Sequence, residues 1–278
     1  MAAQALESPR GAGVVWTLRL TQQFLIHICL SSILVLLTGK EMLPLIYCAV
    51  TLLGASALFA AEPGAVTQAR QAPAKEDPRL PRVIIVGDSI SLGYTDEVRK
   101  LLAGKANVHR VLGNTGPSSS GVQKVAGWVD PTNGTWDVIH FNFGLHDIKL
   151  GSGGKDNQPY ATTDGHQIPP DEYERNLRQI VAKFQTTGAV LVWCSTTPVP
   201  AGKLDPPRQP DDVVKYNNIA RKVMNENGVL IDDLYSIALP RLAEVQLPHN
   251  VHYTKEGSAE LAKHVAASIE MALKNKRR

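Results

Sequence analysis

Cysteine is scarce in this sequence, and its placement does not suggest a disulfide framework. The chain has three cysteines, and Cys29 and Cys48 lie in an apolar N-terminal region. Only Cys194 remains in the main part of the chain. Small disulfide-stabilised domains carry several closely spaced cysteines, so this sequence needs a hydrophobic core instead.

An excess of charge of one sign is also missing. The 278 residues include 29 basic and 26 acidic side chains, for a formal net charge of +3. The basic tail KNKRR is short and typical of a solvated chain end, so we expect no nucleic-acid partner. A hydrophobic fraction of 44% is ordinary for globular proteins and leaves room for one large domain or two small ones.

Metal and phosphate signatures are absent as well. The sequence has no H-E-x-x-H motif and no paired cysteines, although His146, Asp147, His249 and His252 could be considered as ligands. GSGGKD lacks the Ser or Thr that follows the lysine of a phosphate-binding loop. We therefore expect neither a metal nor a cofactor.

Two long apolar runs are present near the N-terminus, at residues 24–38 and 43–60. The second begins after Met42 and ends in small residues before an acidic, proline-containing stretch, which is typical of a secretory signal over 42–61. Residues 1–41 are then an upstream extension, and the protein is secreted or periplasmic. The alternative is a membrane anchor through residues 24–60, although the first run is shorter than the ~20 residues that usually span a bilayer.

Residues 62–80 are rich in Ala, Pro and Gln, a composition typical of a linker.

From residue 81 onward, apolar runs alternate with segments of helical periodicity. Strands are expected in VIIV, VHRVLG, WDVIHFNFG, AVLVWCSTTP and GVLIDDLY, and helices at residues 94–103, 119–129, 171–187, 211–227 and 255–274. This alternation predicts an α/β fold, a five-stranded parallel sheet with helices on both faces.

Binding sites in such sheets form beyond the carboxyl ends of the strands. That edge should gather residues 87–89, 113–120, 144–147 and 196–200, and the loop LPHNVHYTKEG can reach it. Residues 149–170 form a long polar insert that reads either as a substrate-facing flap or as a loop without a role.

Ser89 ends the first strand in RVIIVGDSISLGY and has two interpretations. A serine or aspartate there commonly caps the next helix. A serine nucleophile would instead need a base, and His252 is the best-placed histidine because its loop precedes the last helix. Donors for a developing oxyanion could be the Ser89 N–H, the backbone at Gly116 and a side chain from FGLHD.

These segments together resemble the SGNH hydrolases, the GDSL esterase/lipase superfamily, and suggest a bacterial-type secreted member. GDSISLG is similar to the first block, NTGPSSSG to the second and HNVHYTKEG to the last, over about residues 82–275. The resemblance implies a flavodoxin-like three-layer α/β/α sandwich over 81–278. It implies Ser89 as nucleophile, His252 as general base, and an oxyanion site made by Ser89, Gly116 and the residue at 146.

The sequence departs from the pattern of this superfamily at two positions. GLHD stands where the third block usually reads Gly-x-Asn-Asp, so His146 would replace the oxyanion asparagine, with Asn142 as an alternative donor. His249 stands where the last block usually has the aspartate that orients the base. The site would then be a Ser–His dyad, or another acid would serve: Asp147, Asp232 or Asp233.

The resemblance implies a serine esterase, and the secretory signal makes it an exported one that cleaves a short acyl ester. The signal and the polar insert favour acetylated polysaccharide as one substrate class. The alternative is a carbohydrate- or ligand-binding module that keeps the fold but has a weakened triad. The departure at His249 favours the module, whereas Ser89 and His252 favour the enzyme.

Overall fold

A computed structural model describes residues 70–71, 75–151 and 165–276. The expected extension, signal segment and membrane anchor lie outside the described residues, as do most of the insert and much of the expected linker. Within the described ranges, no helix is both long enough and apolar enough to cross a membrane.

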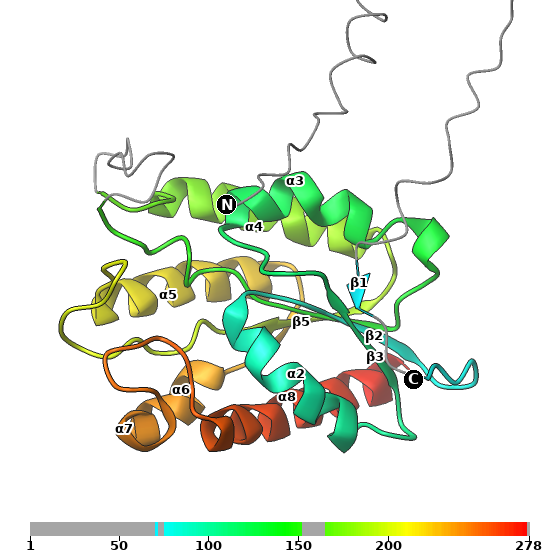
Figure 1. The fold of residues 1–278 in the computed structure, drawn as a ribbon. Helices are drawn as coiled ribbons and strands as arrows, with labels where there is room; N and C mark the ends of the chain where they lie inside the picture. The colour runs from blue at the N-terminus through cyan, green and yellow to red at the C-terminus, as the bar shows by residue number, and fades with distance from the viewer. Residues whose placement is uncertain (1–69, 72–74, 152–164, 277–278) are drawn as a thin grey trace, which may run out of the picture. The chain divides into compact units, whose positions relative to one another are not determined.

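The centre of the fold is a parallel β-sheet (Figure 1). Its five parallel strands run in the order β3-β2-β4-β5-β6 and correspond to the five expected from the sequence. They are β2 (Arg82–Val86), β3 (Asn107–Val111), β4 (Val138–Phe141), β5 (Val190–Cys194) and β6 (Leu230–Asp232). A short strand, β1 (Arg70–Gln71), pairs antiparallel with β3 at the edge, inside the segment expected to be a linker.

Helices cover both faces of the sheet, as expected for a three-layer α/β/α sandwich (Figure 1). One layer contains α2 (Ser89–Leu101) and α8 (Lys255–Lys276), with the short α6 (Leu234–Ala238) and α7 (Leu242–Val245) beside them. The other contains α3 (Ser118–Trp128), α4 (Pro170–Gln185) and α5 (Pro210–Glu226). Two 3₁₀ turns, Pro131–Asn133 and Leu239–Arg241, complete the described elements.

The sequence explains the central strands directly. Val83 to Val86 are buried and at most 1% exposed, because a parallel strand covered on both faces has no polar side. The helix that follows, α2, begins at Ser89 rather than at the expected Tyr94. Asp88 is its N-cap and accepts a hydrogen bond from the Ile90 N–H at 2.9 Å. The capping function therefore belongs to Asp88 and leaves the Ser89 hydroxyl available.

Candidate active site

Ser89 and His252, which are far apart in the sequence, are in direct contact. Ser89 is the first residue of α2, at the carboxyl end of β2, and His252 lies in the loop before α8. Ser89 Oγ and His252 Nε2 are 2.8 Å apart, and His252 is exposed to solvent. A hydroxyl and an imidazole at this distance have the geometry needed for proton transfer from the hydroxyl to the ring.

The other ring nitrogen of His252 contacts Asn250. Asn250 Oδ1 lies 2.7 Å from His252 Nδ1 and also accepts a hydrogen bond from the His252 backbone N–H at 3.0 Å. An amide oxygen can only accept, so the ring carries its proton on Nδ1. Nε2 is then unprotonated and can accept the proton of Ser89, which is the tautomer that a general base requires.

The expectation that His249 orients His252 is wrong in this structure, because Asn250 occupies that position. His249 follows Pro248 in a turn closed by a hydrogen bond from the Asn250 N–H to the Leu247 carbonyl. Its φ of 51° lies in the left-handed region, which the third residue of a type II turn requires after a proline. The His249 side chain is exposed, and its role is in the turn.

The three aspartates considered as substitutes are all engaged elsewhere. Asp232 Oδ2 is 3.0 Å from His140 Nε2 in the core, and Asp233 caps α6 and pairs with Arg221 at 2.9 Å. Asp147 accepts hydrogen bonds from Ser118. In the described part of the chain, the acceptor for the His252 Nδ1–H is an amide oxygen and not a carboxylate.

Arg110 holds the turn that carries Ser89, and sequence analysis missed it. The side chain is 1% exposed, and its guanidinium donates to the carbonyls of Gly87 at 2.9 Å and Asp88 at 3.0 Å. It also donates to the Gly113 carbonyl at 2.7 Å, at the start of the next loop. No ion pair of Arg110 occurs among the described residues. An arginine inside the otherwise apolar strand VHRVLG was the available signal, because a buried charge needs such partners.

The backbone N–H of Gly116, the second expected oxyanion donor, already donates a hydrogen bond within the protein. Gly116 has a φ of 71°, which favours glycine, and its N–H donates to Asn114 Oδ1 at 2.9 Å. A substrate oxygen would have to displace Asn114 Oδ1 before it could accept a hydrogen bond from Gly116. The Ser89 N–H differs, because the first N–H groups of a helix have no acceptor within the helix.

His146 lies in the loop after β4, which Gly144 begins. A Cβ at Gly144 would collide with Thr196 Oγ1, so the loop needs glycine to pass this side chain. His146 is largely buried, and burial together with the charges of Lys149 and Arg208 lowers its pKa to about 3. The ring is therefore neutral over the working range of most enzymes and can donate one hydrogen bond.

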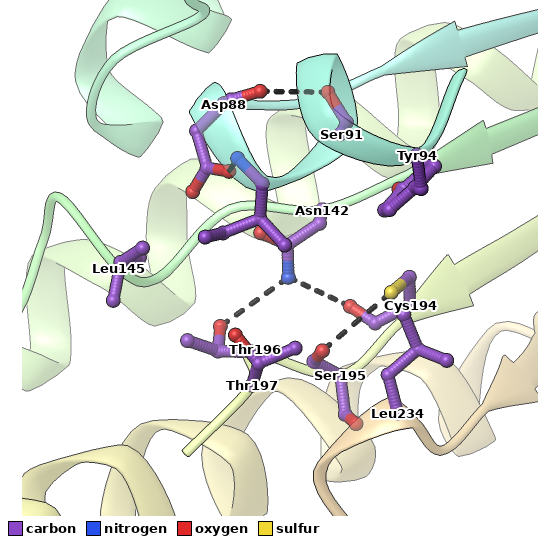
Figure 2. A pocket seen from close by; sticks show the side chains of 11 residues that line it. Asp88, Ser91, Tyr94, Asn142, Leu145, Cys194, Ser195, Thr196, Thr197 and Leu234 are labelled. Carbon is purple, nitrogen blue, oxygen red and sulfur yellow. Dashed lines mark hydrogen bonds between the residues drawn. The ribbon is translucent and has the colours of Figure 1, made fainter. Parts of the chain in front are cut away.

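Asn142, the alternative donor, is directed into the protein. Its amide nitrogen donates to the Cys194 carbonyl at 2.7 Å and to Thr196 Oγ1 at 3.3 Å (Figure 2). Asn142 lines a small cavity beneath the Ser89 turn, with Asp88 and Ser91 on the opposite wall. The cavity has a volume of about 10 Å³, room for roughly one water molecule. It is too small for an acyl chain, and Asn142 is a structural link between β4 and β5.

Asp147 connects the His146 loop to the start of α3. It is fully buried and accepts hydrogen bonds from the Ser118 N–H at 2.9 Å and from the Ser118 hydroxyl. Asn176 of α4 donates to the same hydroxyl at 3.0 Å. Burial raises the pKa of Asp147 to about 6, against the hydrogen bonds from Ser118, which lower it.

This raised pKa gives a test based on stability. A carboxyl group with a higher pKa in the folded state stabilises the fold fully below its unfolded pKa of 3.8 and loses that contribution as the pH rises through about 6. The difference corresponds to about 3 kcal/mol. We expect the stability of Asp147→Asn relative to wild type to rise by about this amount between pH 3.5 and pH 7, measured by urea unfolding. The exposed Asp171→Asn is the matched control and should show no such rise, since Arg175 lowers the pKa of Asp171. A constant difference for Asp147→Asn would contradict the assignment.

Within the described ranges, one group of side chains is close enough to share a metal ion. His140, Cys194 and Asp232 place ligand atoms within 4.8 Å of one another in the core. Ser268 donates to Asp232 Oδ2 at 3.0 Å, the same oxygen that contacts His140. This group is distinct from the four residues considered as ligands from the sequence, and a hydrogen-bonded core network accounts for it.

Comparison with solved structures shows the fold. The chain is similar to a lipase/acylhydrolase from Enterococcus faecalis, with 17% identity and a TM-score of 0.56 over 69% of this chain and 96% of that chain. It is also similar to an acetyl xylan esterase, AlAXEase, with 19% identity and a TM-score of 0.52 over 68% and 99% of the two chains. For an acetylxylan esterase from Geobacillus stearothermophilus, the identity is 17% and the TM-score 0.51 over 68% and 94%.

No curated protein matches the chain in a sequence comparison. The family model for GDSL-like lipases and acylhydrolases matches residues 85–259, a region that includes Ser89, the His146 loop and His252. The resemblance of the sequence to the SGNH superfamily is thereby confirmed, and the chain belongs to the GDSL-like lipase/acylhydrolase family.

Proposed function

We propose that this protein is an exported serine esterase that uses Ser89 as nucleophile and His252 as general base. The observation that carries the proposal is the chain of contacts from Ser89 Oγ through His252 to Asn250, with distances of 2.8 Å and 2.7 Å. Membership of a family of lipases and acylhydrolases supports ester hydrolysis. The arrangement is a Ser–His–Asn triad, in which a neutral amide replaces the carboxylate.

The reaction proceeds in two halves. His252 Nε2 takes the proton of Ser89 Oγ as the oxygen attacks the ester carbonyl, and the negative charge that forms on the carbonyl oxygen accepts hydrogen bonds. The Ser89 N–H and the His146 side chain are the donors we assign, joined by the Gly116 N–H once the substrate oxygen displaces Asn114 Oδ1. His252 then gives its proton to the leaving alcohol. In the second half, His252 takes a proton from water as the water oxygen attacks the acyl carbonyl. The bond to Ser89 Oγ then breaks, His252 returns its proton to Ser89 Oγ, and the acid is released.

The acyl group we propose is short, and acetyl groups on a polysaccharide are the favoured substrate class. Two structures with the same fold are acetyl xylan esterases. The cavity beneath the Ser89 turn offers only about 10 Å³, so it cannot receive an alkyl chain. The exposed position of His252 suits a bulky alcohol that remains largely in solvent.

A chromogenic ester series tests this proposal. Purified protein is assayed with p-nitrophenyl acetate, butyrate and decanoate, and acetate release is measured from acetylated xylooligosaccharides. We expect turnover that is fastest with the acetyl ester. If the wild-type protein hydrolyses these esters no faster than the Ser89→Ala variant does, the esterase proposal is contradicted.

The second candidate function is a carbohydrate- or ligand-binding module. The observation that favours it is the neutral Asn250 at His252, since an amide supplies no charge to stabilise an imidazolium. Calorimetric titration with acetylated and deacetylated oligosaccharides distinguishes the two candidates. A module would bind both without releasing acetate.

Export is the part of the proposal that rests on the sequence of residues 42–61. Signal cleavage should give a mature protein that starts near Ala61 or Glu62, which intact-mass measurement of the secreted protein detects. Recovery of the chain with Met1 in the membrane fraction would contradict export by cleavage and support the anchor through residues 24–60.

A further inference from the structure

The side chain of Lys149 contacts the ring of His146. Lys149 Nζ lies 2.9 Å from His146 Nδ1, across one turn of the loop that follows β4. The Lys149 backbone is fixed as well, because its N–H donates to the His146 carbonyl at 3.2 Å and its carbonyl accepts from the Gln167 N–H at 2.8 Å. The contact therefore joins two residues of one ordered loop.

The chemistry of this contact determines which ring nitrogen of His146 carries the proton. An ammonium group has three donors and no acceptor, so the hydrogen between the two atoms belongs to Lys149. His146 Nδ1 must then be the unprotonated nitrogen. In a neutral imidazole the single N–H is consequently at Nε2, on the far side of the ring from Lys149.

Burial and neighbouring charges keep the His146 ring neutral, and two carboxyl groups support the charged form of Lys149. Two cationic side chains lie near His146, Lys149 in its own loop and Arg208 before α5, and His252 before α8 adds a third positive charge only when its ring is protonated. Each of these charges disfavours a second proton on the ring. Burial and the charge of Arg208 lower the pKa of Lys149 from its usual value, while Asp88 and Asp147 oppose this shift and favour the ammonium form.

We propose that Lys149 is a positioning residue that holds His146 in the tautomer whose Nε2–H donates to the substrate oxyanion. The proposal rests on the proposed esterase function for its catalytic consequence. The asparagine that the SGNH superfamily usually has at this position always offers its side-chain NH₂ as a donor. A neutral histidine offers an N–H toward the substrate only in the correct tautomer. Lys149 supplies this selection, and its charge also polarises the ring and strengthens the Nε2–H as a donor.

The first test measures the tautomer directly and does not require activity. Long-range ¹H–¹⁵N correlation spectra of the full chain, labelled at histidine, report which ring nitrogen is protonated, and His146→Asn identifies the signals. We expect His146 protonated at Nε2 at pH 7 in the wild type. In Lys149→Met, the ring should shift to a mixture or to Nδ1–H. A wild-type His146 protonated at Nδ1 would overturn the proposal.

The second test is a double-mutant cycle in the ester assay. Removing one oxyanion donor typically costs about 10²–10³ in kcat, so we expect Lys149→Met to lower kcat by about 10- to 100-fold with little change in KM. Lys149→Gln keeps a donor for Nδ1 and should recover most of the loss. In a His146→Asn background, Lys149→Met should cost less than about 3-fold, because neighbouring residues that act through each other are not additive.

Lys263→Met is the matched control, since Lys263 forms an exposed ion pair with Glu260 on α8. It should change neither kcat nor the tautomer. Equal costs of Lys149→Met in the wild-type and His146→Asn backgrounds would overturn the proposal, because Lys149 would not then act through His146. A wild type without esterase activity would contradict the proposed function, while the spectra would still decide the tautomer.

Discussion

Ser89→Ala should abolish ester hydrolysis and leave the fold intact. Loss of a serine nucleophile in a triad can cost about 10⁶ in kcat, and we expect a fall of at least about 10⁴ here. The stability should change little, because the cap of α2 is Asp88 and the Ser89 hydroxyl contacts His252 in an exposed part of the site. Initial rates with p-nitrophenyl acetate and thermal unfolding measure the two quantities.

Ser236→Ala is the matched control for this substitution. Ser236 is an exposed serine in α6 that donates to Asp233, so its loss removes a hydroxyl without touching His252. The control should keep wild-type turnover. Retention by Ser89→Ala of more than a few per cent of the wild-type rate would show that another group attacks the ester.

Asn250→Asp should raise turnover, and it is the second substitution with a large expected effect. The new carboxylate can accept the same two hydrogen bonds from His252 that Asn250 Oδ1 accepts now, at its ring and at its backbone. It adds a negative charge beside the imidazolium that forms in the transition state. In a full triad the aspartate is worth up to about 10⁴ in kcat relative to asparagine, part of which reflects the ring tautomer. Because the tautomer is already correct here, we expect a gain of about 10-fold, measured as kcat at pH 8.

Asn250→Ala should lower kcat by about 10- to 100-fold, because it removes the acceptor that fixes the ring. His249→Asp, which the sequence alone suggests as a repair of the triad, should leave turnover close to wild type. His249 is exposed and occupies the left-handed position of its turn. A gain from His249→Asp without one from Asn250→Asp would contradict the assignment of Asn250.

The sequence predicted the architecture well because its signals are local and strong. Four buried branched residues in β2, and similar runs in the other strands, have few alternatives to a covered parallel strand. Once the sheet is parallel, the carboxyl ends of its strands share one edge. The approach of His252 to Ser89 follows from that topology, and the structure places the two side chains in contact.

The partner of His252 could not be predicted in the same way, since it depends on the conformation of a loop. The position usual for an aspartate in the superfamily pointed to His249. The turn over Leu247–Asn250 instead sends that side chain to solvent and brings the next residue to the ring. A usable signal was the asparagine two residues before His252, because asparagine side chains often bond to the backbone two residues further on.

The supporting polar groups were missed for a different reason. Arg110 and Lys149 lie outside the blocks that resemble the superfamily, and their partners are backbone carbonyls and a ring nitrogen. Such contacts depend on where loops meet in space. A charged side chain inside an apolar strand indicates that buried partners exist but does not identify them.

The measurement that tests the central claim most directly is covalent labelling of the active enzyme. A fluorophosphonate reacts with activated serine hydroxyls, and peptide mass spectrometry locates the adduct. We expect one adduct per chain, on Ser89, which forms rapidly in wild type and at least about 100-fold more slowly in His252→Ala, because the hydroxyl needs its base. Labelling of a different residue, or equal labelling rates with and without His252, would contradict the account.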